Sequence, residues 1–251
     1  MQQTPTTWSR FENTWRNQRQ YLEKDAFEVL KKYTLIEPRA LKHLWNGPGR
    51  VYHDWTHARY LMSLAVQMRD NIEQDGVIFD HLILAILFHD AIYVPGSGLN
   101  ELMSAELLKG CAKPETWGIL LQPVYEAIMD TAYGSTLCQP IKEGHRRFKP
   151  LSYWLQQLDL YQLIQGEAQD LRDDQMINFI KVYHEFEHVL LWSGLDQDSQ
   201  KKQAFEEKQN QFLTALAQKF GFPYTPLTWD EIYQRNADEP LRNEPIDIDD
   251  I

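Results

Sequence analysis

The sequence contains very little cysteine, with Cys111 and Cys138 as its only two thiols. Two cysteines are too few for a disulfide-stapled scaffold or for a cysteine-rich zinc site. This usage favours a chain that works in a reducing compartment.

Long hydrophobic runs are also missing. The longest apolar stretch, Leu82–Phe88, is far too short to cross a bilayer and is closed by His89 and Asp90. The segment Met1–Arg10 has no apolar core flanked by basic residues, so it does not resemble a secretory signal. We therefore expect a soluble, cytoplasmic protein that has no membrane partner.

Positive charge is scarce, because the formal net charge of the chain is −11 at pH 7. Binding to nucleic acid or to an anionic membrane requires a basic surface that neutralises phosphates. The composition thus argues against general nucleic-acid binding. A small phosphorylated substrate stays compatible with it, provided that positive charge is gathered locally.

What the sequence does contain, over most of its 251 residues, is apolar residues at spacings of three and four. This periodicity predicts an all-α fold, and no run of strict alternation marks a strand. We expect one domain over residues 1–235, followed by an acidic tail over 236–251 with little to bury. The predicted helices are Trp8–Tyr33, Arg39–Trp45, Trp55–Asn71, Gly76–His89, Glu101–Lys109, Glu115–Thr131, Leu151–Leu163, Asp174–Trp192 and Ser199–Phe220.

Two histidines four residues apart, His53 and His57, stand in the segment YHDWTHA. This spacing places both imidazoles on one face at the start of a helix, so both can point at the same place. The simpler interpretation is a pair of solvated surface histidines.

Further polar residues stand where apolar helices would bury them. His89 and Asp90 end the apolar stretch before them, and Asp159 lies within the apolar helical run around Leu158 and Leu160. A carboxylate against a core costs on the order of several kcal/mol unless it is paired or bound to a cation. The simpler interpretations are a helix cap at His89, a turn at Asp90 and a salt bridge at Asp159.

Two histidines and two aspartates from these segments would together supply mixed nitrogen and oxygen ligands. Such a set suits a divalent ion of manganese, iron, cobalt, nickel, zinc or magnesium and leaves coordination positions open. A bound ion lowers the pKa of a coordinated water and polarises a phosphoryl oxygen. The residues therefore predict a metal-dependent hydrolase.

The order of these segments resembles a group of metal-dependent phosphohydrolases of the HD superfamily. The resemblance runs over about residues 50–190. It rests on Tyr52-His53-x-x-x-His57, on His89-Asp90 closing an apolar helix, on Asn100-Glu101-x-x-Ser104-Ala105 and on Leu158-Asp159-Leu160. The first segment is also similar to that of the cyclic nucleotide phosphodiesterases, which are distant relatives. The resemblance implies an HD-type helical bundle around a central metal site.

The resemblance assigns roles to the polar residues. It implies that His57, His89, Asp90 and Asp159 are the metal ligands. It implies that His53 is the acid that protonates the leaving oxygen, a role for which imidazole is apt because its pKa lies near working pH.

Other residues are candidates for substrate contact. Glu101 would orient the attacking water or contact a second ion, or it is simply a glutamate favoured by a helix N-terminus. Asn100 is a substrate contact or an N-cap. Arg50, just ahead of the histidine pair where the resemblance also expects arginine, is the best phosphate ligand. Arg146, in the basic cluster between Lys142 and Lys149, is a second one.

The chain departs from the family pattern near Thr131, where a histidine soon after the threonine is expected. The sequence there reads DTAYG. His145 would have to substitute after an insertion, so the simpler inference is a site for a single ion.

The chain is thus predicted to hydrolyse a phosphoester or phosphoanhydride of a small molecule, with a nucleotide as the substrate class that the resemblance implies. One rival is a zinc metallopeptidase, because His184-Glu185-Phe186-Glu187-His188 matches the zinc-binding pattern H-E-x-x-H. Another is a catalytically inactive HD scaffold that binds a nucleotide or a protein partner. The oligomeric state is left open.

Overall fold

The structure of the chain is a computed structural model. It describes residues 22–95, 97–132, 149–164 and 199–220, together with the single residues Asn178, Lys181, Val182, Glu185 and Pro226. Most of these residues are helical, which confirms the all-α class. Within the described ranges no strand is formed, and β-pairing is confined to one isolated bridge between Thr34 and Ala112.

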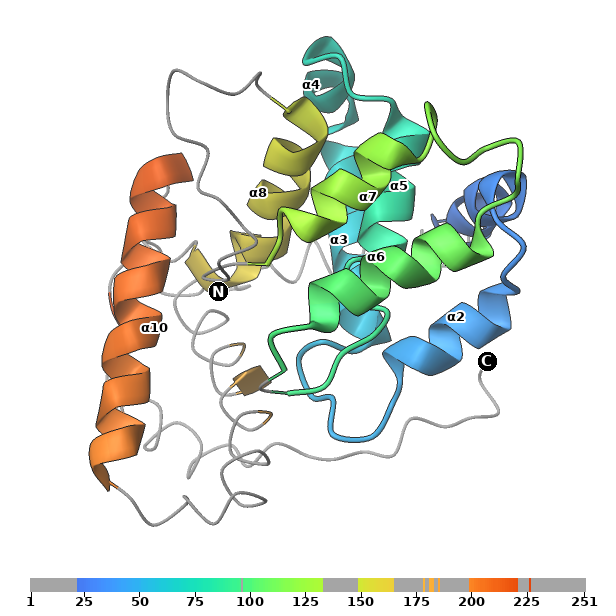
Figure 1. The fold of residues 1–251 in the computed structure, drawn as a ribbon. Helices are drawn as coiled ribbons and strands as arrows, with labels where there is room; N and C mark the ends of the chain where they lie inside the picture. The colour runs from blue at the N-terminus through green and yellow to red at the C-terminus, as the bar shows by residue number, and fades with distance from the viewer. Residues whose placement is uncertain are drawn as a thin grey trace, which may run out of the picture. The chain divides into compact units, whose positions relative to one another are not determined.

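Residues 22–33 form the first described helix. The helices that follow are α2 Pro38–Trp45, α3 Trp55–Gln67, α4 Arg69–Gln74, α5 Phe79–Phe88, α6 Asn100–Cys111, α7 Gln122–Met129, α8 Pro150–Ile164 and α10 Ser199–Phe220 (Figure 1).

The chain divides into two compact units. The first comprises Met1–Gln162 and Lys181–Asp196, and the second comprises Leu163–Ile180 and Gln197–Ile251. All the site residues discussed below belong to the first unit, whereas α10 belongs to the second. The single domain expected over residues 1–235 stays a prediction, and the predicted acidic tail, 236–251, lies outside the described residues.

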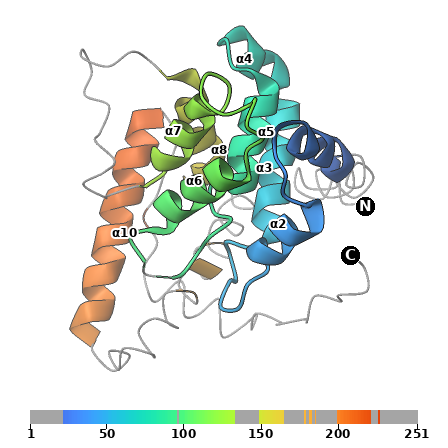
Figure 2. The same ribbon diagram turned by 45° about the vertical axis from the view of Figure 1, so that its right-hand side comes forward.

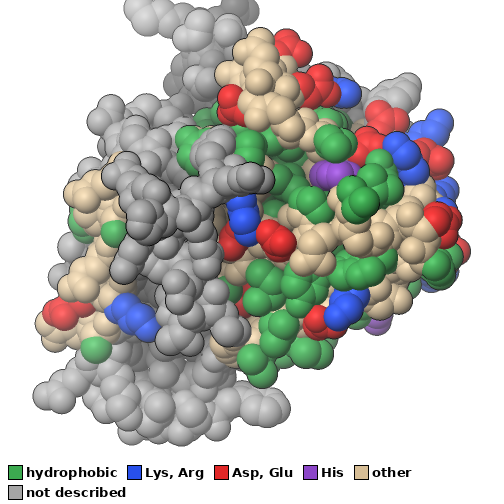
Figure 3. Space-filling model, turned by 45° about the horizontal axis from the view of Figure 1, so that its top comes forward, with side chains coloured by type: hydrophobic (Ala, Val, Ile, Leu, Met, Phe, Trp, Pro, Cys, Tyr) green, Lys and Arg blue, Asp and Glu red, His purple; other side chains and the backbone are tan. Residues whose placement is uncertain are grey.

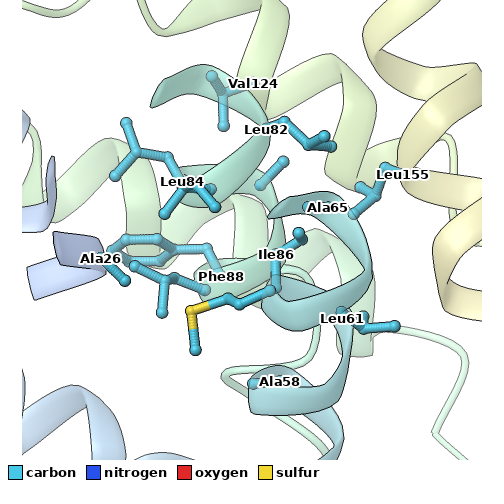
Figure 4. Packing of buried hydrophobic residues seen from close by; sticks show 14 of the residues in the cluster. Ala26, Ala58, Leu61, Ala65, Leu82, Leu84, Ile86, Phe88, Val124 and Leu155 are labelled. Carbon is cyan, nitrogen blue, oxygen red and sulfur yellow. The ribbon is translucent and has the colours of Figure 1, made fainter. Parts of the chain in front are cut away.

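Helix α5 is the centre of the first unit. It packs against α3, α4, α6 and α7 (Figures 1 and 2). The residues from His81 to Phe88 are all buried, and a helix that is apolar on every side must be surrounded by other elements. Figure 4 shows the side chains that meet there: Leu82, Leu84, Ile86 and Phe88 of α5, Ala58, Leu61 and Ala65 of α3, Val124 of α7 and Leu155 of α8.

Local chemistry explains where several helices begin. Pro38 occupies the first turn of α2, where a missing N–H costs nothing. The Asp54 carboxylate caps α3 by accepting hydrogen bonds from the backbone N–H groups of Thr56 and His57, at 2.8 and 3.2 Å. This cap fixes the helix start that carries His57.

Three predicted helices were wrong in their extent. Gly76 does not begin a helix, because its φ of 81° is left-handed and α5 begins only at Phe79. The helix expected from Glu115 begins at Gln122, because Gly118 has a φ of 87° and Pro123 suits a first turn. The helix expected over Trp55–Asn71 divides at Met68, where neither glycine nor proline marks the break.

The other helices agree with the sequence predictions where the structure describes them. Residues 22–33 and the ranges of α2, α6, α8 and α10 match within a residue or two. Of the helix expected over Asp174–Trp192, only the four single residues between Asn178 and Glu185 are described, and each is helical.

Figure 3 shows one face of the molecule, on which acidic and basic side chains of the described residues are interspersed among apolar ones. None of the described helices is both long and apolar enough to span a membrane.

We expect the core around α5 to dominate stability. Replacing the fully buried Ile86 by alanine should lower the free energy of unfolding by about 2 to 5 kcal/mol, because a cavity is left in the packed interior. Ile78, at the N-cap of the same helix, is 57% exposed and serves as a matched control. Its alanine variant should change stability by less than about 0.5 kcal/mol. Urea unfolding followed by far-UV circular dichroism measures both, and equal losses would contradict the central place of α5.

Candidate metal centre

Four side chains that are far apart in the sequence converge in the first unit: His57 of α3, His89 and Asp90 at the end of α5, and Asp159 of α8. One ligand atom from each lies within 4.8 Å of all the others. The group is buried, with side-chain exposures of 1% for each histidine, 11% for Asp90 and 13% for Asp159. The predicted ligand set therefore forms a group that could hold a metal ion.

The spacing of the ligand atoms fits metal coordination. His57 Nε2 lies 3.0 Å from Asp159 Oδ1, and His89 Nε2 lies 3.1 Å from Asp90 Oδ2 and 3.4 Å from Asp159 Oδ1. An ion with ligand bonds of about 2.1 Å separates neighbouring donors by roughly 3.0 to 3.4 Å. These three distances match those between neighbouring ligands of one ion, and all four ligand atoms lie within 4.8 Å of one another.

The His89 side chain is set in the orientation of a metal ligand. Its Nδ1 lies 2.9 Å from the carbonyl oxygen of Ile86, which can only accept, so Nδ1 carries the proton. The lone pair of Nε2 then faces the cluster. Nε2 is buried and lies near both carboxylates, but no hydrogen bond satisfies it. In metal-bound histidines, one ring nitrogen typically donates to a backbone carbonyl while the other is directed at the ion, and His89 has this arrangement of contacts.

His57 has a similar arrangement of contacts. Its Nδ1 lies 3.4 Å from Gln162 Oε1, one turn beyond Asp159 on α8, while Nε2 faces Asp159. The same helix thus supplies a ligand and the group that orients another ligand. Such outer contacts hold the ring in place for coordination.

The electrostatics of the cluster require a positive charge. Burial raises the pKa of Asp90 and Asp159, but the neighbouring imidazoles lower both pKa values more, so both carboxyl groups stay ionised. Burial lowers the pKa of His89, but the charges of Asp90 and Asp159 raise it well above its ordinary value. Two buried carboxylates are therefore compensated by protons on the imidazoles or by a bound cation.

His53 lies beside this cluster rather than in it. Its Nε2 is 4.0 Å from Asp90 Oδ2, whereas Nδ1 is 2.6 Å from Glu185 Oε2. The Tyr93 ring stacks on the imidazole, with 4.1 Å between centroids. Burial lowers the pKa of His53, but Glu185 and Asp90 raise it above its ordinary value. The His53 ring is thus held with Nδ1 hydrogen-bonded to the Glu185 carboxylate and Nε2 directed toward the four candidate ligands.

Glu185 organises the loop that carries His53. Its Oε1 accepts hydrogen bonds from the backbone N–H groups of Val51, Tyr52 and His53, at 2.6, 2.7 and 2.9 Å. Burial raises the pKa of Glu185, but His53 and these N–H groups lower it below its ordinary value, so the carboxylate is ionised. Both of its oxygens are therefore already bound.

This use of Glu185 weighs against the peptidase alternative. In the H-E-x-x-H pattern the glutamate acts as general base on a zinc-bound water. Glu185 instead supports the loop of another site. His184 and His188 lie outside the described residues.

The motif Asn100-Glu101-x-x-Ser104 clamps the loop that follows Asp90. Asn100 accepts a hydrogen bond from Val94 N–H and donates one to Val94 O, at 2.9 and 3.0 Å. Ser104 does the same with Ile92, at 3.0 and 3.1 Å. The spacing of four places both side chains on one face of α6, where each satisfies both polar groups of one loop residue.

These contacts bear on the proposed roles of Asn100 and Glu101. The N-cap of α6 is Leu99, so Asn100 does not cap this helix, and its amide is taken up by Val94. Glu101 is partly buried near the cluster. Burial and the charges of Asp90 and Asp159 raise its pKa. Its role toward water or a second ion stays a prediction.

Arg50 donates to three backbone carbonyl groups. Its Nη1 lies 2.7 Å from both His53 O and Asp90 O, and Nη2 lies 2.9 Å from Ala91 O. Arg50, the predicted phosphate ligand, is thus hydrogen-bonded to backbone groups of the protein. Arg146, the other predicted phosphate ligand, lies outside the described residues, as does His145.

Aromatic residues that the sequence did not single out enclose the cluster. Trp45 is fully buried, donates from Nε1 to Leu87 O at 2.8 Å, and has its ring 5.4 Å from that of His89. The Tyr52 ring lies 4.8 Å from that of His57. The contact of Glu185 with His53 spans 132 residues, so no local pattern could reveal it.

We expect the protein to bind one divalent ion at this cluster. Protein purified without a histidine tag and loaded with metal should contain about one equivalent, and Asp90→Ala or His89→Ala should lose it because each removes a ligand. Asp70→Ala and His43→Ala alter exposed residues of the same types and should retain the ion. Elemental analysis after gel filtration measures this. Equal metal content in all variants would place the ion elsewhere.

Comparison of the chain with protein-family models, with curated proteins and with solved structures finds no match in any of the three. The resemblance to the HD superfamily therefore rests on the sequence motifs and stays a prediction.

Proposed function

We propose that this protein is a metal-dependent phosphohydrolase of the HD type, which hydrolyses a phosphoester or phosphoanhydride of a small molecule with one divalent ion. The observation that carries the proposal is the convergence of His57, His89, Asp90 and Asp159 in one buried group beside an oriented histidine, His53.

The ligand set suits hydrolysis better than a purely structural role. A structural zinc site is closed by four protein ligands that are mostly cysteine and histidine. Two carboxylates and two imidazoles leave positions open on an ion that prefers six ligands. When bound, the ion supplies a water of lowered pKa and a Lewis acid for a phosphoryl oxygen.

The chain's own residues perform the remaining tasks. Asp90 and Asp159 carry the negative charge that retains the ion, and the buried walls at Trp45 and Tyr52 keep bulk water from the imidazoles. A low dielectric strengthens each of these charge interactions. His53 is the most exposed of these side chains, at 19%, and marks the side from which we propose that a substrate approaches.

His53 is suited to act as the acid. Glu185 and Asp90 raise its pKa, which favours the protonated ring, and Nε2 is the nitrogen that faces the cluster. Glu185 accepts the Nδ1 hydrogen bond and so holds the ring in this direction. As Nε2 gives its proton to the leaving oxygen, Glu185 keeps the other proton on Nδ1.

The two alternatives differ from this proposal in measurable ways. A zinc peptidase would lose its metal when His184 is replaced, whereas the proposed site would lose it only through the four ligands named above. An inactive scaffold would bind metal but turn over no phosphorylated substrate. A nucleotide substrate follows from the resemblance alone.

We expect His53→Asn to separate metal binding from turnover. The variant should keep the ion and lose about 10²- to 10⁴-fold in rate, because only proton transfer is removed. Glu185→Gln should reduce the rate less than His53→Asn does. The amide oxygen can still accept the backbone hydrogen bonds, but the neutral amide no longer balances the charge of His53. His43→Asn, at an exposed histidine of α2, is the control. The assay is a panel of nucleotides and nitrophenyl phosphate mono- and diesters with metal-loaded protein. Undiminished turnover in Asp90→Ala would refute the proposal.

A further inference from the structure

Arg50 stands at the meeting point of the two loops that build the site. One loop carries His53, and the other carries Asp90 directly after α5. The Arg50 guanidinium binds the carbonyl oxygen of His53 on one side and those of Asp90 and Ala91 on the other. One side chain thus joins the residue placed as acid to a residue placed as metal ligand.

We propose that Arg50 is a positioning residue that sets the distance between His53 and the His89–Asp90 pair, and that it does not bind the phosphate of the substrate. This inference rests on the proposed function, because it assigns Arg50 a task within that site.

The three carbonyl contacts already occupy most of the guanidinium. Arginine has five N–H donors in a planar fork, and three of them are used here. Turning the fork toward a substrate phosphate would leave three carbonyl groups without donors next to the buried cluster. A carbonyl group that loses its donor in such surroundings destabilises the loop, because water does not fully replace the lost hydrogen bond.

Two aromatic rings hold the guanidinium in this orientation. The Arg50 Cζ lies 5.6 Å from the ring centroid of Trp45 and 5.5 Å from that of Tyr93. Trp45 in turn lies against His89, and Tyr93 stacks on His53. The rings that contact the arginine are therefore the ones that contact His89 and His53.

The position of the Arg50 guanidinium at the C-terminal end of α5 also favours a fixed positive charge. The Asp90 and Ala91 carbonyls follow the C-terminus of α5, where a helix carries partial negative charge and unsatisfied carbonyl groups. Burial lowers the pKa of Arg50, whereas Asp90 and Glu185 act in the opposite direction. Lysine can copy only part of this contact, because its single nitrogen can replace Nη1 between His53 O and Asp90 O but cannot also supply the second donor to Ala91 O.

The test compares Arg50→Lys and Arg50→Met with Arg69→Met. Arg69 is a matched control, since it also donates a hydrogen bond, in its case to the Glu73 carboxylate at 2.8 Å, and also lies near an aromatic ring, that of Phe79 at 4.5 Å, but is exposed and belongs to α4. Titration with Co²⁺, followed calorimetrically and by the visible absorption of the bound ion, reports affinity and coordination without any substrate. Turnover of a nitrophenyl phosphodiester then separates kcat from KM.

We expect the metal dissociation constant to rise about 10- to 100-fold in Arg50→Met, with a changed Co²⁺ spectrum, as for other residues that orient ligands. Arg50→Lys should fall short of the wild type in both readouts, kcat should drop, and KM should stay nearly constant. Guanidinium ion added to an Arg50→Ala variant should restore part of the metal affinity, which a variant that fails to fold would not show. Arg69→Met should behave as the wild type.

The contrary results are equally distinct. Unchanged metal affinity and spectrum, with a raised KM and a constant kcat, would show that Arg50 binds substrate and would overturn the inference while the proposed function stands. Absence of metal binding by the wild-type protein would overturn the proposed function itself, and this inference with it.

Discussion

The burial of Asp90 and Asp159 among apolar helices is the constraint on which the rest of the structure depends. Two carboxylates in a core are tolerated only beside positive charge and fixed donors. His57 and His89 meet that need within 3.4 Å. The Nε2 atoms of both imidazoles face the carboxylates, so a bound cation could replace the protons that compensate these charges. The group that makes the burial tolerable is therefore also the candidate metal site.

The end of α5 makes that burial possible because its carbonyl groups are satisfied by side chains from elsewhere. His89 binds Ile86 O, Trp45 binds Leu87 O, and Arg50 binds the carbonyls of Asp90 and Ala91. Beyond it, Ser104 and Asn100 of α6 satisfy both polar groups of Ile92 and Val94. An apolar helix can thus end inside the fold, with two polar residues held against the core, because the loop that follows it has a partner for each of these groups.

Two residues of opposite charge, Glu185 and Arg50, together hold the loop that carries His53. Glu185 binds the loop's N–H groups and the His53 ring, while Arg50 binds the loop's carbonyl and joins it to Asp90. A carboxylate can only accept and a guanidinium can only donate, so each satisfies the half of the backbone that the other cannot. Glu185 and Arg50 together therefore determine where His53 lies relative to the four candidate ligands.

Periodicity alone determined the helical class and the bounds of α2, α8 and α10, because apolar spacing and proline act within a few residues. The candidate ligands His89, Asp90 and Asp159 were also visible in sequence, since polar residues within apolar helices are costly without a partner, whereas the choice of His57 over His53 came from the family resemblance. Only the tertiary structure decided that Arg50 and Asn100 bind backbone groups and that Glu185 supports His53. These partners lie up to 132 residues apart in the chain. Every residue has a backbone carbonyl group, so the residue type does not show which carbonyl a side chain will bind. That choice depends on how the fold brings the loops together.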